Sequence, residues 1–147
     1  MAVKTLIPMS MTDEQLLVDT SVWFSYADRK DKHHEVVDRF FAEEKGYIYV
    51  TTDYIIDETI TMTARKAGHL AAVKIGRMLW SGKMAAVIPV IRSLQQEAME
   101  LFEKFDDKFF SFTDCTSFAV MNRFSIQKAL SFDSDFKKAG FISLPTL

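Results

Sequence analysis

Cysteine, proline and glycine are all scarce in this chain of 147 residues, which has one, three and five of them respectively. The single cysteine, Cys115, excludes an internal disulfide and a paired-cysteine metal site, and is consistent with a reducing compartment. So little glycine and proline argues against a fibrous or disordered chain. Hydrophobic residues make up 48% of the sequence and include 13 phenylalanines. We therefore expect a globular protein with a well-filled core.

Long hydrophobic runs are also missing. No segment approaches the roughly 18 apolar residues that cross a membrane, and the short apolar stretch 6–9 does not resemble a secretory signal. We expect a cytoplasmic protein without membrane contact. The length suits a single domain, which we expect over residues 15–147 behind a flexible leader over 1–14.

Short apolar runs alternate with segments of helical periodicity. The expected strands are 16–18, 47–50, 85–91, 126–132 and 141–144, with Pro89 placing the third at a sheet edge or a bulge. Apolar steps of three and four residues predict helices between them, including one capped by Ser93 and one capped by Thr113. Such alternation predicts a three-layer α/β/α sandwich around a mostly parallel sheet.

Three aspartates fall at one expected edge of this sheet. Asp19 ends the first strand, Asp133 ends the fourth, and Asp114 begins a helix. Ligands of open α/β sheets bind at the carboxyl ends of the strands, beside helix N-termini. An aspartate between a strand and a helix is often only a cap, so none of the three is diagnostic alone. Together they favour a magnesium site, because crowded carboxylates raise one another's pKa and a hard cation relieves the repulsion.

Four segments, taken in order, resemble a known family. They are residues 16–23 (LLVDTSVW), 57–59 (DET), 112–119 (FTDCTSFA) and 130–136 (LSFDSDF). These segments are similar to the four successive acidic motifs of the PIN-domain family, and residues 140–145 resemble the family's final strand. The resemblance covers about residues 16–145, and the size is similar to that of the VapC-like toxins of toxin–antitoxin pairs.

The resemblance implies a site for Mg²⁺ or Mn²⁺ made by Asp19, Glu58, Asp114 and Asp133. Asp19 and Asp114 are expected to be direct ligands, and Glu58 and Asp133 to act directly or through water. The match to the family's Glu-Thr step favours Glu58 over Asp57, although the apolar pattern of the helix does not decide which of the two faces the cleft.

Two further residues are implied as accessories to this site. Thr20 matches the hydroxyl residue that often follows the first aspartate, and is expected to hydrogen-bond a metal-bound water or a phosphate. Asp135 matches the second aspartate of the last motif, and is expected to cap a helix more often than to bind metal.

The implied activity is that of a metal-dependent endoribonuclease, which hydrolyses RNA phosphodiester bonds and is the toxin of a toxin–antitoxin pair. The implied partners are RNA, a small antitoxin protein and a second copy of the chain. One alternative is a catalytically silent PIN-like module that only binds RNA or protein. Another is a magnesium-binding phosphoacceptor receiver domain, which fits poorly because receivers have paired acids after the first strand.

Acidic residues are absent from Thr59 to Arg92, although that stretch contains six lysines and arginines. A locally basic surface on a protein of net charge −2 suits a path for a polyanion. The alternative is an ordinary solvated pair of helices. We expect the phosphate contacts of RNA to come from Arg65, Lys66, Lys74 and Arg77.

Overall fold

The structure, a computed structural model, describes residues 14–146. Its strands are β1 (Glu14–Val18), β2 (Tyr47–Thr52), β3 (Ala86–Ile88), β4 (Lys128–Leu130) and β5 (Ile142–Leu144). Its helices are α1 (Thr20–Ala27), α2 (His34–Glu43), α3 (Asp53–Ala67), α4 (His69–Trp80), α5 (Arg92–Lys104), α6 (Phe112–Arg123) and α7 (Asp135–Lys138). None of these helices is long and apolar enough to cross a membrane.

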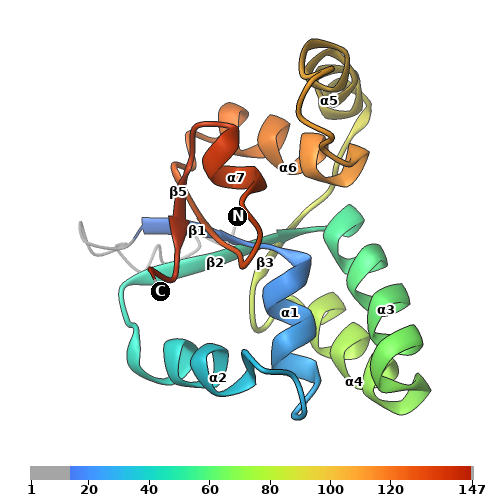
Figure 1. The fold of residues 1–147 in the computed structure, drawn as a ribbon, viewed down its shortest axis with the longest axis vertical. Coiled ribbons are helices and arrows are strands. Elements are labelled where there is room, and N and C mark those ends of the chain that lie inside the picture. The colour runs from blue at the N-terminus through green and yellow to red at the C-terminus, as the bar shows by residue number, and fades with distance from the viewer. Residues whose placement is uncertain (1–13, 147) are drawn as a thin grey trace, which may run out of the picture.

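The five strands form one sheet in the order β3-β2-β1-β4-β5, and every neighbouring pair is parallel. Helices α5, α6 and α7 lie on one side of the sheet, and α1, α2 and α4 lie on the other (Figure 1). Helix α3 packs against α1 and α4, and its contacts also reach α6. The expected three-layer α/β/α architecture is confirmed.

The central strand supplies the middle of the core. Leu16, Leu17 and Val18 of β1 are all completely buried, as expected for a strand covered by helices on both faces. On the α6 side, Phe118 packs edge-on against Phe136 with ring centroids 5.3 Å apart. On the other side, Trp23 of α1 stacks on Phe41 of α2 at 5.5 Å. Burial of such large rings is the main stabilising contribution, at about 25 cal/mol per Å² of apolar surface.

Two helix starts differ from the expectation. Helix α5 begins at Arg92 with Ile91 in the cap position, so Ser93 lies inside the first turn and is not the cap. Helix α6 begins at Phe112 and its cap is Ser111, so the prediction that Thr113 caps this helix was wrong. The Ser111 hydroxyl accepts a hydrogen bond from the Asp114 N–H, which is the favoured geometry for an N-cap serine.

Two strands are also shorter than expected. The third strand stops at Ile88, just before Pro89, which has no N–H to donate to a neighbouring strand. Strand β3 lies at the edge of the sheet, as predicted. The fourth stops at Leu130, so Asp133 lies in the following loop and does not end the strand. Glu14 belongs to β1, so the sheet starts one residue before the expected domain boundary. Residues 1–13 of the expected leader lie outside the described part of the chain.

Candidate active site

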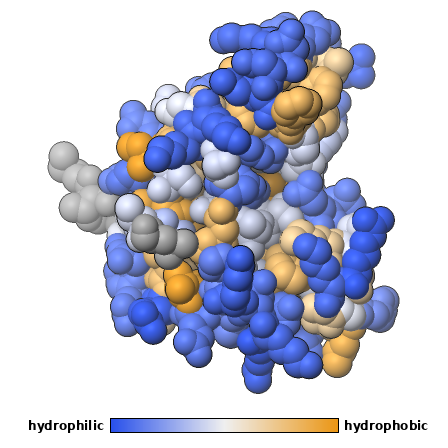
Figure 2. All heavy atoms as spheres, viewed as in Figure 1, coloured by the Kyte–Doolittle hydropathy of each residue, from blue (hydrophilic) through white to orange (hydrophobic). Residues whose placement is uncertain are grey.

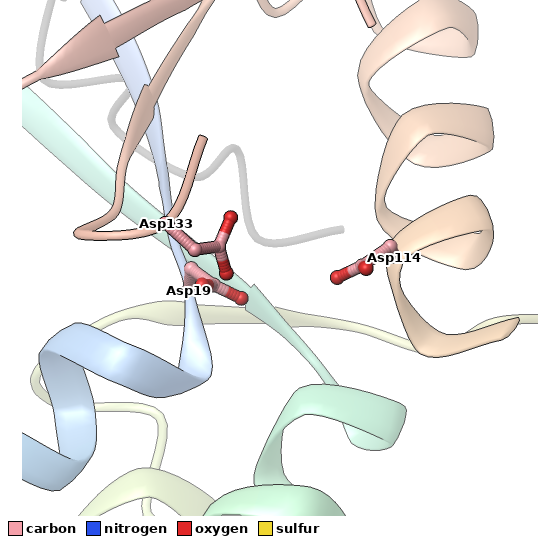
Figure 3. A group of neighbouring side chains, drawn as sticks. All are labelled: Asp19, Asp114 and Asp133. Carbon is pink, nitrogen blue, oxygen red and sulfur yellow. The ribbon is translucent and has the colours of Figure 1, made fainter. Parts of the chain in front are cut away.

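Asp19, Asp114 and Asp133 meet in space although they are far apart in the sequence. Each offers a carboxylate oxygen, and the three oxygens lie within 4.8 Å of one another. The Asp19 and Asp133 side chains face each other, and Asp114 reaches toward them from the first turn of α6 (Figure 3). All three were predicted as metal-site residues, and this is the group that the structure brings together.

The topology explains why the acids converge. Strand β1 lies between β2 and β4, so the chain order reverses at β1, and ligand crevices of open α/β sheets form where this happens. The Asp19 N–H donates to the Leu130 carbonyl over 3.0 Å, which joins the end of β1 to the end of β4. Asp19 occupies the cap position of α1 but makes no side-chain cap bond, so its carboxylate is free for another role.

Two serines hold the Asp19 carboxylate in place. Ser131 Oγ donates to Asp19 Oδ2 over 2.9 Å, and Ser21 Oγ donates to the same oxygen over 3.1 Å. The backbone N–H of Asp133 in turn donates to Ser131 Oγ over 3.2 Å. Neither serine was predicted to belong to the site. Their spacing of two residues from Asp19 and from Asp133 is the local signal that was available, since serines often bond to groups two residues away.

Asp114 is held by a capping box. The Ser111 N–H donates to Asp114 Oδ2 over 3.0 Å, and the Asp114 N–H donates back to Ser111 Oγ over 3.0 Å. These two bonds satisfy two of the free N–H groups at the start of α6. They also fix the direction of the carboxylate, because the backbone N–H of Ser111 engages Oδ2.

Burial and mutual repulsion disfavour the ionised forms of Asp19 and Asp114. Burial, followed by repulsion from Asp133, raises the pKa of Asp19 to about 8, although the hydrogen bond from Ser131 works in the opposite direction. Burial likewise raises the pKa of Asp114 to about 7, with smaller contributions from Asp133 and Asp135. A divalent cation among these oxygens would remove the repulsion and hold all three groups ionised.

Glu58 is not part of the three-carboxylate group within residues 14–146. It is half-buried on α3 and lines a neighbouring hollow of about 340 Å³, to which Thr113, next to Asp114, also contributes. Asp57 lines the same hollow and is more exposed. Glu58 therefore lies outside the three-carboxylate group, in a hollow that Thr113 also lines.

The two accessory residues are also near the acids. Thr20 is buried directly after Asp19, and its hydroxyl has no hydrogen-bond partner among the described residues. Asp135 is the first residue of α7 and Ser134 takes the cap position, so the expectation that Asp135 caps a helix was wrong. The Asp135 N–H donates to Asp133 Oδ1 over 3.0 Å. The Asp135 carboxyl is close enough to Asp114 to raise the pKa of that group.

The four basic residues expected to contact RNA lie in different places. Arg65 and Lys66 line the hollow that contains Glu58 and Thr113. Lys74 lines a different and larger hollow of about 880 Å³, formed by α1, α2 and α4. Arg77 is exposed on α4, three residues from Lys74. The stretch without acids is thus divided between two surfaces.

Cys115 is no nucleophile despite its position next to Asp114. Its side chain is completely buried, as expected of a small core residue. Burial and the neighbouring Asp114 raise the pKa of the thiol to about 11, so the reactive thiolate is scarce near neutral pH.

The sequence pattern described as the PIN domain matches residues 16–142, which include all three clustered aspartates and Glu58. The chain belongs to the PIN-domain family. It is 36% identical over 129 residues to the 23S rRNA-specific endonuclease VapC20 of Mycobacterium tuberculosis strain H37Rv, an alignment that covers 88% of this chain and 97% of that protein. It is 30% identical over 136 residues to a VapC ribonuclease of Archaeoglobus fulgidus, covering 89% of this chain and 81% of that protein.

Solved structures show the same relationship. The crystal structure of M. tuberculosis VapC20, described as a toxin that cleaves the sarcin–ricin loop, matches with a TM-score of 0.81 and 34% identity, covering 86% of this chain and 96% of that one. The structure of VapBC2 from Rickettsia felis, bound to a promoter DNA fragment, matches with a TM-score of 0.63 and 7% identity, and the match covers 88% of this chain and 97% of that one. At so low an identity this match shows a likeness of fold alone. The prediction of a PIN-domain ribonuclease of the VapC-like toxin class is confirmed.

Proposed function

We propose that this PIN-domain protein hydrolyses RNA phosphodiester bonds at the site formed by Asp19, Asp114 and Asp133, with Mg²⁺ or Mn²⁺ as its cofactor. The observation that supports this most is the convergence of these three carboxylates at the point where the strand order reverses. The alternative of a receiver domain loses its basis, because the chain belongs to the PIN-domain family.

The donors present fit such a cation. Mg²⁺ and Mn²⁺ are hard ions that prefer oxygen ligands, and the group consists of carboxylates alone. Oxygens bound to one Mg²⁺ are at most about 4.2 Å apart, since each bond is about 2.1 Å long. The separation here is 4.8 Å or less, so only small side-chain rotations would be needed for the three carboxylates to hold one ion. When bound, the ion supplies an acidified water and positive charge for the phosphate.

The protein's own groups would then position the reactants. Ser131 and Ser21 orient Asp19, and the capping box orients Asp114. The unpaired Thr20 hydroxyl is available to donate to a water or a phosphate oxygen. We infer that Glu58 contributes through water from the cleft wall. Arg65 and Lys66, which line the same hollow, would attract the RNA backbone.

The activity is tested by incubating the purified protein with total RNA and with intact ribosomes, each with Mn²⁺ or with a chelator, and sequencing the new RNA ends. We expect metal-dependent cuts at a small number of positions. The ribosome arm asks whether the substrate is rRNA, as the printed name of VapC20 says of that relative. An absence of metal-dependent ends in both arms would leave the catalytically silent RNA- or protein-binding module as the better description.

We also propose that the protein is the toxin of a pair, silenced by a small antitoxin protein, and that it forms a homodimer in the cytoplasm. The similarity to VapC20, described as a toxin, supports the first part. Large exposed apolar side chains, including Leu70 at 68% and Met99 at 46% exposure, offer surface for protein contacts. Growth arrest on expression, relieved by co-expression of the neighbouring small gene, is the expected result. Light scattering measures the oligomeric state, and a strict monomer at high concentration would contradict the dimer.

A further inference from the structure

Asp133 is the exposed member of the three clustered acids, and it lies in the loop between β4 and α7. Asp114 faces this loop from α6 (Figure 3), and the surface is hollowed between α6 and α3 (Figure 2). Asp133 thus belongs to no helix or strand that would fix the direction of its side chain. Because a metal site works only when its ligands are held in place, the contacts of this loop decide how well Asp133 can serve.

Phe132, the residue before Asp133, is fixed at two points. Its backbone N–H donates to Ser21 Oγ over 3.1 Å, and Ser21 Oγ in turn donates to Asp19 Oδ2 over 3.1 Å. Its ring lies face to face with the ring of His33, with centroids 4.0 Å apart and planes inclined by 10°. At this separation the two ring faces are in van der Waals contact, so neither ring can tilt unless the other moves.

His33 is itself fixed by the connection between α1 and α2, residues 28–33. Asp31 Oδ2 accepts the His33 N–H over 2.9 Å and the hydroxyl of Ser25 over 2.7 Å. Ser25 is buried in α1, and an aspartate that bonds to the backbone two residues later fixes a tight turn. His33 occupies the cap position of α2, but its side chain makes no cap bond. The ring is therefore held in a defined place and is available to Phe132.

The position of the stack indicates what it does. Neither His33 nor the adjacent His34 belongs to a group of metal-ligating side chains within residues 14–146. His34 is used by α1 instead, since its Nδ1 lies 2.8 Å from the Ser25 carbonyl oxygen. The rings of His33 and Phe132 are both half-buried, so their stack lies at the margin of the core. What it fixes is the residue next to Asp133.

We propose that His33 is a positioning residue of the metal site, whose ring holds Phe132 so that the Asp133 carboxylate faces Asp19 and Asp114. This inference rests on the proposed metal-dependent activity of these acids, and it adds a residue that acts on Asp133 through Phe132. The flat ring is what matters, because the contact is a face-to-face stack. The substitution His33→Phe should therefore preserve the effect, whereas His33→Gln, which keeps hydrogen-bonding groups but has no ring, should lose it.

The first measurement tests the stack itself. The chain has three histidines, so the ring-proton signals of each can be followed by NMR, and the His33 signal is the one that His33→Phe lacks. We expect this signal upfield of the ordinary histidine position, because the ring lies over the face of Phe132. Phe132→Leu should abolish the shift. A His33 signal at the ordinary position in the natural protein overturns the proposal.

The second measurement is the affinity of the full chain for Mn²⁺ without RNA, followed by the EPR signal of the free ion. We expect His33→Ala and His33→Gln to weaken Mn²⁺ binding about tenfold, the lower end of the range for residues that orient a ligand, and His33→Phe to leave it unchanged. Phe40→Ala is the matched control. Phe40 lies about two turns further along α2, where its ring stacks on Tyr47 at a centroid distance of 6.1 Å. Its loss should lower the unfolding temperature but not the Mn²⁺ affinity.

Cleavage separates positioning from a general loss of structure. His33→Ala removes no ligand, so excess Mn²⁺ should restore its cleavage rate to near that of the natural protein. The effects of His33→Ala and Phe132→Leu on Mn²⁺ affinity should not add in the double variant, because both remove one contact. If His33→Ala does not fold, His33→Gln takes its place.

Three results overturn the positioning role. One is Mn²⁺ affinity that is unchanged in both His33→Ala and His33→Gln. Another is a His33→Phe variant that binds Mn²⁺ as poorly as His33→Gln. The third is an equal loss of Mn²⁺ affinity in Phe40→Ala, which identifies a general loosening of α2.

The same experiments separate this inference from the proposed function. A protein that cleaves RNA, while its His33→Ala variant binds Mn²⁺ normally, overturns only the positioning role. A protein that cuts no RNA, but whose Mn²⁺ binding is weakened by His33→Gln and kept by His33→Phe, overturns only the proposed function. A protein that neither binds Mn²⁺ nor cleaves RNA overturns both.

Discussion

Ser131 donates a hydrogen bond to the Asp19 carboxylate over 2.9 Å, although the two residues are separated by 112 positions in the sequence. The Ser131 hydroxyl also accepts the N–H of Asp133 over 3.2 Å. One small side chain thus positions two of the three clustered acids. The geometry of the candidate metal site depends on the pairing of β1 with β4, which brings Ser131 to Asp19.

Replacing Ser131 should therefore impair metal use without removing a ligand. Ser131→Ala deletes a hydrogen bond that lowers the pKa of Asp19, so we expect that pKa to rise further. Partners of this kind typically affect metal affinity or activity by about 10- to 100-fold.

The measurement is cleavage rate against Mn²⁺ concentration at several pH values. The metal requirement should increase and the rising limb of the pH profile should move to higher pH. Ser131→Thr keeps a hydroxyl and should restore much of the activity, and an Ala variant with an unchanged pH profile would contradict the positioning role.

Removing a clustered carboxylate should abolish cleavage and stabilise the metal-free fold. Asp19→Asn and Asp114→Asn are each expected to reduce metal-dependent cleavage by more than about 100-fold, beyond the loss expected for a partner that only orients a ligand. Each also removes a buried carboxyl whose ionised form is disfavoured first by burial and then by its acidic neighbours, and Asp19→Asn should raise the free energy of unfolding by about 1–3 kcal/mol near neutral pH. Cleavage assays and urea unfolding with a chelator measure the two effects. Near-natural cleavage by either folded variant would remove that residue from the site.

The stability of the metal-free protein should fall as pH rises. The pKa values of Asp19 and Asp114 are raised from 3.8 to about 8 and about 7, so between about pH 4 and pH 8 the folded state binds more protons than the unfolded state. Unfolding is then favoured by increasing pH across that window. Metal needs the ionised carboxylates and should bind more tightly at high pH. Thermal unfolding is measured from pH 5 to 8.5, once with Mn²⁺ and once with a chelator. The difference between the two unfolding temperatures should increase with pH. A difference that decreases as pH rises would contradict the assignment of these acids to a metal site. Asp19→Asn should make the difference smaller.

Charge reversal should distinguish the two basic surfaces. Arg65 and Lys66 line the hollow that contains Glu58 and Thr113, whereas Lys74 lines the hollow between α1, α2 and α4. We expect Arg65→Glu with Lys66→Glu to weaken RNA binding and to lower the slope of log affinity against log salt by about 1.4, at about 0.7 for each lost phosphate contact on a single strand. Lys74→Glu with Arg77→Glu is the matched pair, made in the same Asp19→Asn background. If the second pair of substitutions lowers RNA affinity and its salt dependence by as much or more, the RNA path runs across α4.

The fold and the three acids were predictable because both depend on local pattern and a general rule of topology. Leu16, Leu17 and Val18 form an apolar run that ends in a polar residue, which indicates a buried strand, and strands separated by helices indicate a parallel sheet. Carboxyl ends of parallel strands then collect Asp19 and Asp133 at one edge.

The parts that were missed depend on competition between neighbouring residues or on contacts distant in sequence. Thr113 and Ser111 are both capable caps, and only the reciprocal bonds between Ser111 and Asp114 decide between them. The contact of Ser131 with Asp19 requires the paired strands. Helical spacing places Lys74 on a face of α4, but which hollow that face borders depends on how α4 packs against its neighbours.

The position of β4 between β1 and β5 has a consequence for the timing of protein synthesis. β1 is the first strand of the domain to leave the ribosome, but one of its two neighbours is β4, which is made more than a hundred residues later. Before that point Asp133 does not yet exist and Asp19 lacks its partner Ser131. A growing chain therefore lacks the three-carboxylate group of the proposed active site until β4 and the loop after it have been made.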